Sequence, residues 1–116
     1  MTVDMIDTIC WTTVCRLDDL LPERGAAVLV GVDQVAVFRT FSGGLYAVGN
    51  RDPYSGVYVM SRGIVGSRGA EPTVASPMHK HVFSLVTGEC LDDPGLSVPT
   101  YPIRVTADGT VEVSVV

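Results

Sequence analysis

Two short segments hold the side chains best suited to chemistry, Asn50–Gly56 and Ser76–His81. His79 and His81 are two positions apart, so on a strand their side chains would share a face. With the carboxylate of Asp52 nearby, they could form a mononuclear metal site, since imidazole and carboxylate are common ligands. The alternative is a pair of loop histidines without a third well-placed ligand, and the sequence favours this second interpretation. We therefore predict no metal site in this chain.

A hydrolytic site can also be drawn from these segments. Ser76, His79 and Asp52 supply the three residue types of a catalytic triad. The sequence offers neither the strained strand-to-helix elbow that exposes a nucleophilic serine nor an oxyanion hole. The glycine-rich run Gly63–Gly69 resembles a phosphate-binding loop superficially, but it lacks the Gly-Lys-Ser/Thr sequence and the strand–loop–helix frame. We therefore predict no catalytic residue in this chain, and a turn region at Gly63–Gly69.

The cysteines lie outside both segments. Cys10, Cys15 and Cys90 are odd in number and show no Cys-x-x-Cys spacing. Nothing in their surroundings would activate a redox thiol. We expect buried or half-buried reduced thiols, which is the usual state of free cysteine.

Short β-strands separated by turns must position the two segments. Gly31-Val32-Asp33 and Ala107-Asp108-Gly109 are typical hairpin connections, and Leu17–Leu21 is a short turn-like or helical piece that ends at Pro22. No longer stretch has a helical period. Strands are expected at Ile9–Cys15, Ala26–Val30, Gln34–Thr40, Leu45–Val48, Pro72–Ser76, His81–Leu85, Tyr101–Thr106 and Thr110–Val115.

This pattern predicts one all-β domain over residues 1–116, a small barrel or sandwich. The region Gly49–Lys80 is rich in Gly, Pro, Arg and Ser and reads as a long irregular insertion between strands. Long loops inside a compact domain are usually functional or mobile, so we expect this region to carry the function.

The charge balance excludes two classes of partner. Eight basic and 13 acidic residues give a net charge of -5, and the basic residues are scattered singly. Nucleic acid and anionic membranes are therefore poor partners, because phosphate binding needs clustered Lys and Arg. Met1–Cys10 has neither the basic nor the apolar region of a signal peptide, and no apolar stretch approaches the ~20 residues of a membrane span. We expect a cytoplasmic protein.

The two segments, in their order and context, resemble the ligand loops of the Rieske domain. In that family the loops carry Cys-x-His and Cys-x-x-His, and the second loop continues into an aromatic strand and a Thr-Gly turn, as Phe83 and Thr87-Gly88 do here. Asp52 stands at the position of the first cysteine, Tyr54 at the first histidine and Ser76 at the second cysteine; His79 alone matches. A Rieske cluster needs two thiolates on one iron and two imidazoles on the other. The resemblance therefore implies a Rieske-like fold whose [2Fe–2S] ligands are not retained.

This loss of ligands is similar to what the small subunits of assimilatory NAD(P)H-dependent nitrite reductases show, as are the Ser61–Gly66 stretch and the His79-Lys80-His81 run. The resemblance implies a non-catalytic subunit of an oxidoreductase in nitrate assimilation. Its partner large subunit would carry FAD, sirohaem and a [4Fe–4S] cluster and reduce nitrite to ammonium. The alternative is a stand-alone Rieske-fold protein with a mononuclear metal or an interaction role.

The partner surface is expected at the tips of the former ligand loops. Loops on a rigid β scaffold commonly carry recognition. We expect Tyr54, His79, Lys80 and His81 to contact the large subunit. Among the other aromatics, Tyr58 lies in the loop region and is expected to be exposed, whereas Trp11 and Phe83 fit a core.

Overall fold

Ten strands and two short 3-10 helices make up residues 10–115, the part of the chain that the computed structural model describes. The helices are η2 (Leu17–Asp19) and η3 (Met60–Arg62). The strands are β1 (Thr12–Arg16), β2 (Arg24–Val30), β3 (Asp33–Arg39), β4 (Leu45–Gly49), β5 (Ile64–Arg68), β6 (Glu71–Ala75), β7 (Val82–Ser84), β8 (Thr100–Tyr101), β9 (Ile103–Val105) and β10 (Thr110–Val113).

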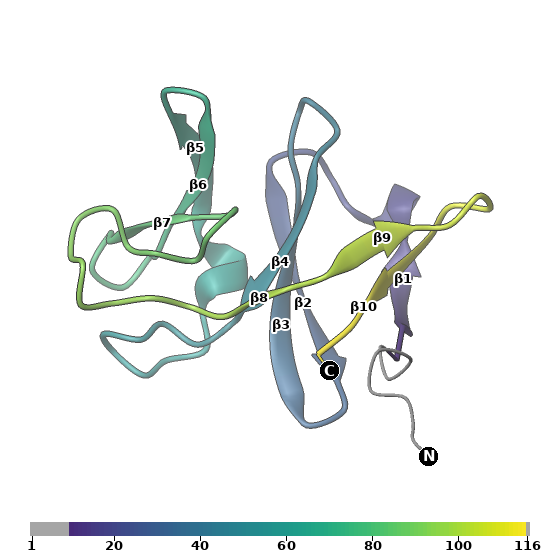
Figure 1. Ribbon diagram of the computed structural model, residues 1–116, viewed down its shortest axis with the longest axis horizontal. Coiled ribbons are helices and arrows are strands. Elements are labelled where there is room, and N and C mark those ends of the chain that lie inside the picture. The colour runs from purple at the N-terminus through teal and green to yellow at the C-terminus, as the bar shows by residue number, and fades with distance from the viewer. Residues whose placement is uncertain (1–9, 116) are drawn as a thin grey trace, which may run out of the picture.

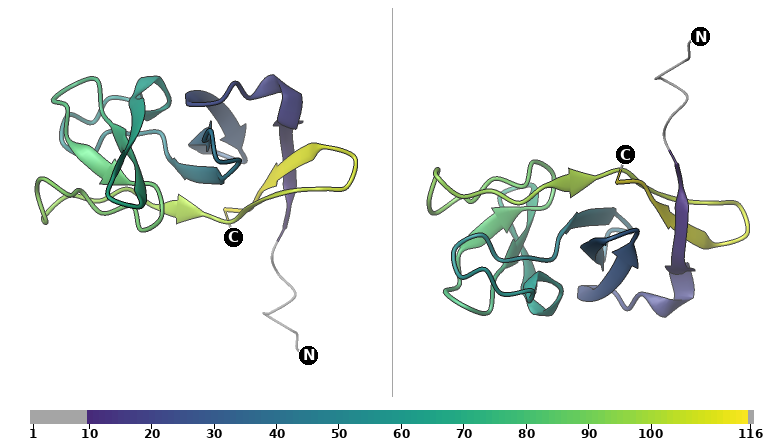
Figure 2. Two further views of the ribbon diagram at one scale, coloured as in Figure 1. Left: turned by 90° about the horizontal axis from the view of Figure 1, so that it is seen from above. Right: turned by 90° about the horizontal axis from the view of Figure 1, so that it is seen from below.

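The strands form three antiparallel sheets (Figure 1). The first has the order β1-β10-β9, the second β2-β3-β4-β8 and the third β5-β6-β7. Seen from above and below, the four-stranded sheet lies between the other two, and the sheets do not close into a barrel (Figure 2). The predicted all-β class is confirmed, and within residues 10–115 no helix is long and apolar enough to cross a bilayer.

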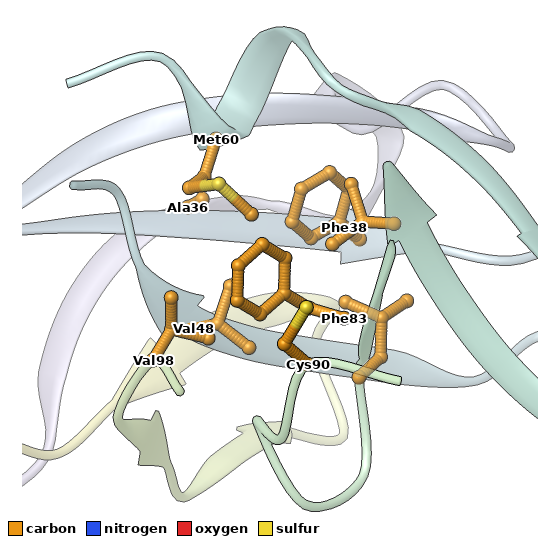
Figure 3. Close-up of a cluster of buried hydrophobic side chains, with 9 residues drawn as sticks. Ala36, Phe38, Val48, Met60, Phe83, Cys90 and Val98 are labelled. Atoms are coloured by element: carbon orange, nitrogen blue, oxygen red, sulfur yellow. The ribbon is translucent and has the colours of Figure 1, made fainter. Parts of the chain in front are cut away.

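The central sheet is buried on both faces, which explains the uninterrupted apolar run in β3. Successive strand residues point to opposite faces. Val35 and Val37 therefore pack with Val111 and Val113 of β10, whereas Ala36 and Phe38 face the third sheet. On that second side the buried cluster comprises Ala36, Phe38, Val48, Met60, Val74, Phe83, Leu85, Cys90 and Val98 (Figure 3). This cluster fixes η3 and β7, the elements that border the two candidate segments.

Three sequence predictions about the scaffold are wrong in detail. Gly63–Gly69 is not a turn region, because Ile64–Arg68 forms β5 and pairs residue by residue with β6. Tyr101–Thr106 is not one strand, because the chain passes at Pro102 from the central sheet (β8) to the first sheet (β9). The Gly31 turn has two residues, since Val30 pairs directly with Asp33.

The termini of the remaining predicted elements shift by a few residues. β1 begins at Thr12, and Ile9 lies outside the described residues. The thiols are free, but Cys10 is exposed rather than buried, while Cys15 is half-buried and Cys90 is in the core. Burial raises the pKa of Cys15, with the Asp19 carboxylate adding to the effect, so this thiol stays protonated near neutral pH.

Candidate functional site

The first candidate segment forms a tight loop between β4 and η3, which we call loop 1 (Asn50–Val57). The amide of Asp52 donates to the carbonyl of Val57 at 2.7 Å, and the carbonyl of Asp52 accepts from the amide of Gly56 at 2.7 Å. Gly56 has a φ of 79°, a left-handed conformation that glycine adopts without steric cost. At the base of the loop, Asn50 accepts a hydrogen bond from the Met60 amide at 3.0 Å, which ties the loop to the buried η3.

The second segment, loop 2 (Ser76–His81), repeats this geometry between β6 and β7. The Ser76 amide donates to the carbonyl of His81 at 2.9 Å, and the Ser76 carbonyl accepts from the amide of Lys80 at 2.9 Å. Lys80 occupies the left-handed position that Gly56 has in loop 1, with a φ of 60°. The two loops are thus built alike, from different residues.

A buried hydrogen bond joins the loops. The hydroxyl of Ser76 donates to Oδ2 of Asp52, whose side chain is completely buried. The other carboxylate oxygen, Oδ1, accepts from the amides of Tyr54 at 2.7 Å and Ser55 at 3.2 Å. Burial by itself would raise the pKa of Asp52. The hydrogen bonds from Ser76, Tyr54 and Ser55 and the nearby His81 imidazole outweigh it, and the pKa is lowered overall.

Three rings gather above this link. The Tyr54 ring lies edge-on to His79 with 4.6 Å between centroids, and its centroid is 5.1 Å from that of His81. The centroids of His79 and His81 are 6.3 Å apart. Both histidines belong to the turn rather than to β7, so the prediction that they share the face of a strand is wrong. Nδ1 of His81 is buried, and within residues 10–115 it has no hydrogen-bond partner.

The residues at the four ligand positions do not fit a [2Fe–2S] cluster. In a Rieske site two cysteines hold one iron and two histidines hold the other. The structure pairs the same positions directly with each other, Asp52 with Ser76 and Tyr54 with His79, and no cysteine lies in either loop. Carboxylate and hydroxyl oxygens are hard ligands that suit a sulfide-bridged iron pair poorly.

The two other chemistries considered from the sequence also find little support. Ser76 donates to Asp52 and not to a histidine, so a nucleophile–base pair is absent from these two loops. Within residues 10–115, no group of three or more His, Cys, Asp or Glu side chains is arranged to hold a metal ion.

A third loop, which contains the predicted Thr87-Gly88 turn, has the same geometry, and this likeness was not predicted from the sequence. In Ser84–Glu89 the Ser84 carbonyl accepts from Gly88, whose φ is 80°, and the Ser84 amide donates to Glu89, both at 2.9 Å. The Ser84 hydroxyl donates to Glu71, as that of Ser76 donates to Asp52. In each of the three loops, a serine or aspartate is followed four positions later by a residue with positive φ. Because this third loop lies away from the ligand positions, we read the geometry as a way of turning the chain.

The tips of loops 1 and 2 are exposed. The exposed fractions of Tyr54, Tyr58 and Met78 are 57%, 53% and 44%, and Lys80 is also exposed. The expected exposure of both tyrosines is therefore confirmed, and Phe83 is in the core as predicted. Trp11 is half-buried under the Arg104 guanidinium, 4.2 Å from the ring centroid.

Comparison with known proteins identifies a matching family and several relatives. Residues 10–114 match the family described as Rieske-like [2Fe-2S] domain. The nitrite reductase (NADH) small subunit of Escherichia coli (strain K12) is 42% identical over 103 residues, which cover 88% of this chain and 94% of that protein.

The fold comparison agrees. A crystal structure of a Mycobacterium tuberculosis protein, assigned as an NADH-dependent nitrite reductase small subunit, superposes with a TM-score of 0.91 at 53% identity. The alignment covers 95% of this chain and 98% of that one. The nitrite reductase [NAD(P)H] large subunit of Klebsiella oxytoca is 36% identical over 95 residues, which are 82% of this chain and 10% of that protein.

Proposed function

The chain belongs to the Rieske-like [2Fe-2S] domain family, and we propose that, like its relatives, it is the small subunit of an NAD(P)H-dependent nitrite reductase. The relatives align over nearly their whole length, so the likeness extends beyond the common fold. The reaction of the complex is the reduction of nitrite to ammonium with electrons from the nicotinamide. Free thiols at Cys10, Cys15 and Cys90 suit a complex that works in the reducing cytoplasm.

Within the complex, this chain is a non-catalytic subunit. The observation that carries this assignment is the direct Asp52–Ser76 hydrogen bond, which occupies the place of two thiolate ligands. A chain without a redox centre at this site does not pass electrons through it. We propose, from the resemblance to these enzymes, that the large subunit carries the FAD, the sirohaem and the [4Fe–4S] cluster.

The large subunit is the proposed partner. A segment like this chain forms part of the large-subunit polypeptide of Klebsiella oxytoca, so the two units can work within one chain. We place the contact at the tips of loops 1 and 2, with Tyr54, His79, Lys80 and His81. Exposed aromatic side chains at such positions are enriched among the residues that dominate binding energy.

Co-purification tests this function. The large subunit should copurify with this chain, and NAD(P)H-dependent nitrite reduction should fall when the chain is omitted and return when it is added.

Tyr54→Ala and Lys80→Glu should each weaken association while leaving the melting temperature of the free chain within a few degrees of the parent's. Asp108→Asn, in the exposed β9–β10 turn, is the matched control and should bind as the parent does. Binding unchanged by both loop substitutions would place the interface elsewhere.

A further inference from the structure

The third sheet has one edge that nothing in the described chain covers. The β7 edge is paired, since the Ser84 amide donates to Glu89 and the Leu91 amide donates to Val82. At the other edge lies β5, and its backbone makes no hydrogen bond within residues 10–115 outside its pairing with β6. The β5–β6 register runs unbroken through five residue pairs, so no bulge protects this edge either.

The register shows which backbone groups of β5 point outward. Ser67 pairs with Pro72, which has no N–H, so this pair is of the non-hydrogen-bonded kind. Pairs alternate along an antiparallel ladder, and Val65 is therefore also in a non-hydrogen-bonded pair. The N–H and C=O groups of Val65 and Ser67 thus point away from β6, in the pattern that an added strand would need.

Two hollows lie along this strand. One, of about 570 Å³, is lined by Ile64 and Val65 on one side and by Arg24 and Gly25 on the other. The next, of about 340 Å³, lies between Gly66–Ser67 and the β3–β4 turn, where the Phe41 side chain is 83% exposed. Glu23 lines both, so the two hollows adjoin at this residue, and we call them together the β5 groove. The β5–β6 and β3–β4 hairpins stand side by side with their turns at the same end of the molecule (Figure 1).

The charges in this groove favour an acidic occupant. Arg24 and Arg62 line its wider part, and both side chains are exposed without an ion pair or hydrogen bond to any described residue. The carboxylate of Glu23 accepts from the Phe41 amide at 3.0 Å, so one of its oxygens is already engaged. Although the chain has a net charge of -5, these two unpaired guanidinium groups favour the binding of carboxylates from another molecule.

We propose that β5 accepts an extended, acidic segment of the large subunit as an added antiparallel or parallel strand. This inference rests on the proposed function and names a second contact besides the loop tips. The segment's backbone pairs with Val65 and Ser67, an apolar side chain covers Ile64, and acidic side chains meet Arg24 and Arg62. A second copy of this chain fits less well, because it would bring another set of these arginines to the same edge.

Hydrogen exchange of the intact complex tests the added strand. In the free chain, the Val65 and Ser67 amides should exchange rapidly, since they have no partner. In the complex, peptides that cover Ile64–Arg68 should gain protection at these amides. A complex that forms without such protection overturns the β5 proposal and leaves the proposed function intact. Failure to form any complex overturns both, and self-association of the free chain with β5 protection assigns the edge to a second copy instead.

Substitutions give an independent readout. Ser67→Pro removes the outward N–H without touching a hydrogen bond to β6, and an edge strand tolerates proline there. It should weaken association with the large subunit about tenfold, whereas Ser67→Ala, which keeps the N–H, should not. The Arg24→Glu and Arg62→Glu double variant should weaken association, and the matching double Lys variant should restore most of it. Tight binding by both Ser67→Pro and the double Glu variant, with folding verified by melting, would contradict the proposal.

Discussion

The Ser76 hydroxyl donates a hydrogen bond to the Asp52 carboxylate, and this bond between residues 24 positions apart joins loops 1 and 2 in the protein interior. The same two positions would hold one iron if both were cysteines. At these positions a charge-assisted hydrogen bond holds the two loops together.

We predict that Asp52→Ala destabilises the chain by about 2–3 kcal/mol, because it removes an acceptor of three hydrogen bonds and leaves the buried Ser76 hydroxyl without its acceptor. Ser76→Ala should cost less, about 1–2 kcal/mol. Urea unfolding of both single variants and the double variant forms a double-mutant cycle. A coupling free energy of roughly 1 kcal/mol or more is expected for the direct contact. Additive effects would show that the two side chains act independently.

Acid should weaken this link. The pKa of Asp52 lies below its ordinary value in the folded chain, so its contribution to stability is present above the unfolded pKa and is lost as pH falls through the folded pKa. Melting temperatures should therefore decline from about pH 4 downward, and the decline should be shallower in Asp52→Asn. Some dependence of the melting temperature on pH should remain in that variant, because two other carboxylates also have lowered pKa values. The hydrogen bond from Arg68 lowers the pKa of Asp92, and that from Thr106 lowers the pKa of Asp108.

The positions of most strands and of loops 1 and 2 could be predicted from the sequence because they depend on local signals, whereas the order of the strands in the sheets depends on pairing between distant segments. Apolar runs mark β2 and β3, alternating apolar residues mark β10, and turn residues lie next to each of them. β5 was missed for a physical reason: Gly66 and Ser67 have little strand propensity, and the strand exists through its pairing with β6. Likewise, no local signal distinguishes Asp52 as buried, since its burial depends on Ser76, which lies in another loop.

Lys80 is strained where loop 1 has a glycine. Its φ of 60° carries a steric cost for any side chain with a Cβ. We predict that Lys80→Gly raises the free energy of unfolding by about 0.5–1 kcal/mol, with part of the gain offset by the entropy of glycine in the unfolded chain.

Gly88→Ala is the matched substitution in the opposite direction. Gly88 has a φ of 80°, and an added Cβ would lie 2.1 Å from the Val98 carbonyl oxygen. This variant should lose more stability than Lys80→Gly gains, and thermal melting compares the two. Destabilisation by Lys80→Gly would show that the lysine side chain makes a contact that compensates the backbone strain.

His79 stands where the Rieske resemblance places a ligand, and we propose that it has no ligand role in this chain. Its ring makes an edge contact with Tyr54, an interaction worth about 0.5–1.5 kcal/mol in ring pairs. His79→Ala should therefore lower stability by about 1 kcal/mol or less and should reduce, but not abolish, nitrite reduction by the assembled complex. Complete loss of activity with assembly intact would indicate a direct chemical role for the imidazole.

Iron binding tests the meaning of the ligand loss. Because Asp52, Tyr54 and Ser76 stand at three of the four ligand positions of the resemblance, the purified chain should be colourless. It should hold no stoichiometric iron or sulfide after anaerobic reconstitution.

The triple variant Asp52→Cys, Tyr54→His and Ser76→Cys, with His79 unchanged, supplies the full ligand set on two loops that share one backbone geometry. It should gain visible absorption, with iron and sulfide in equal amounts. A cluster in the parent chain would refute the non-catalytic assignment. A triple variant that folds but stays colourless would show that the loops, drawn together by the Asp52–Ser76 contact, have also lost the space for a cluster.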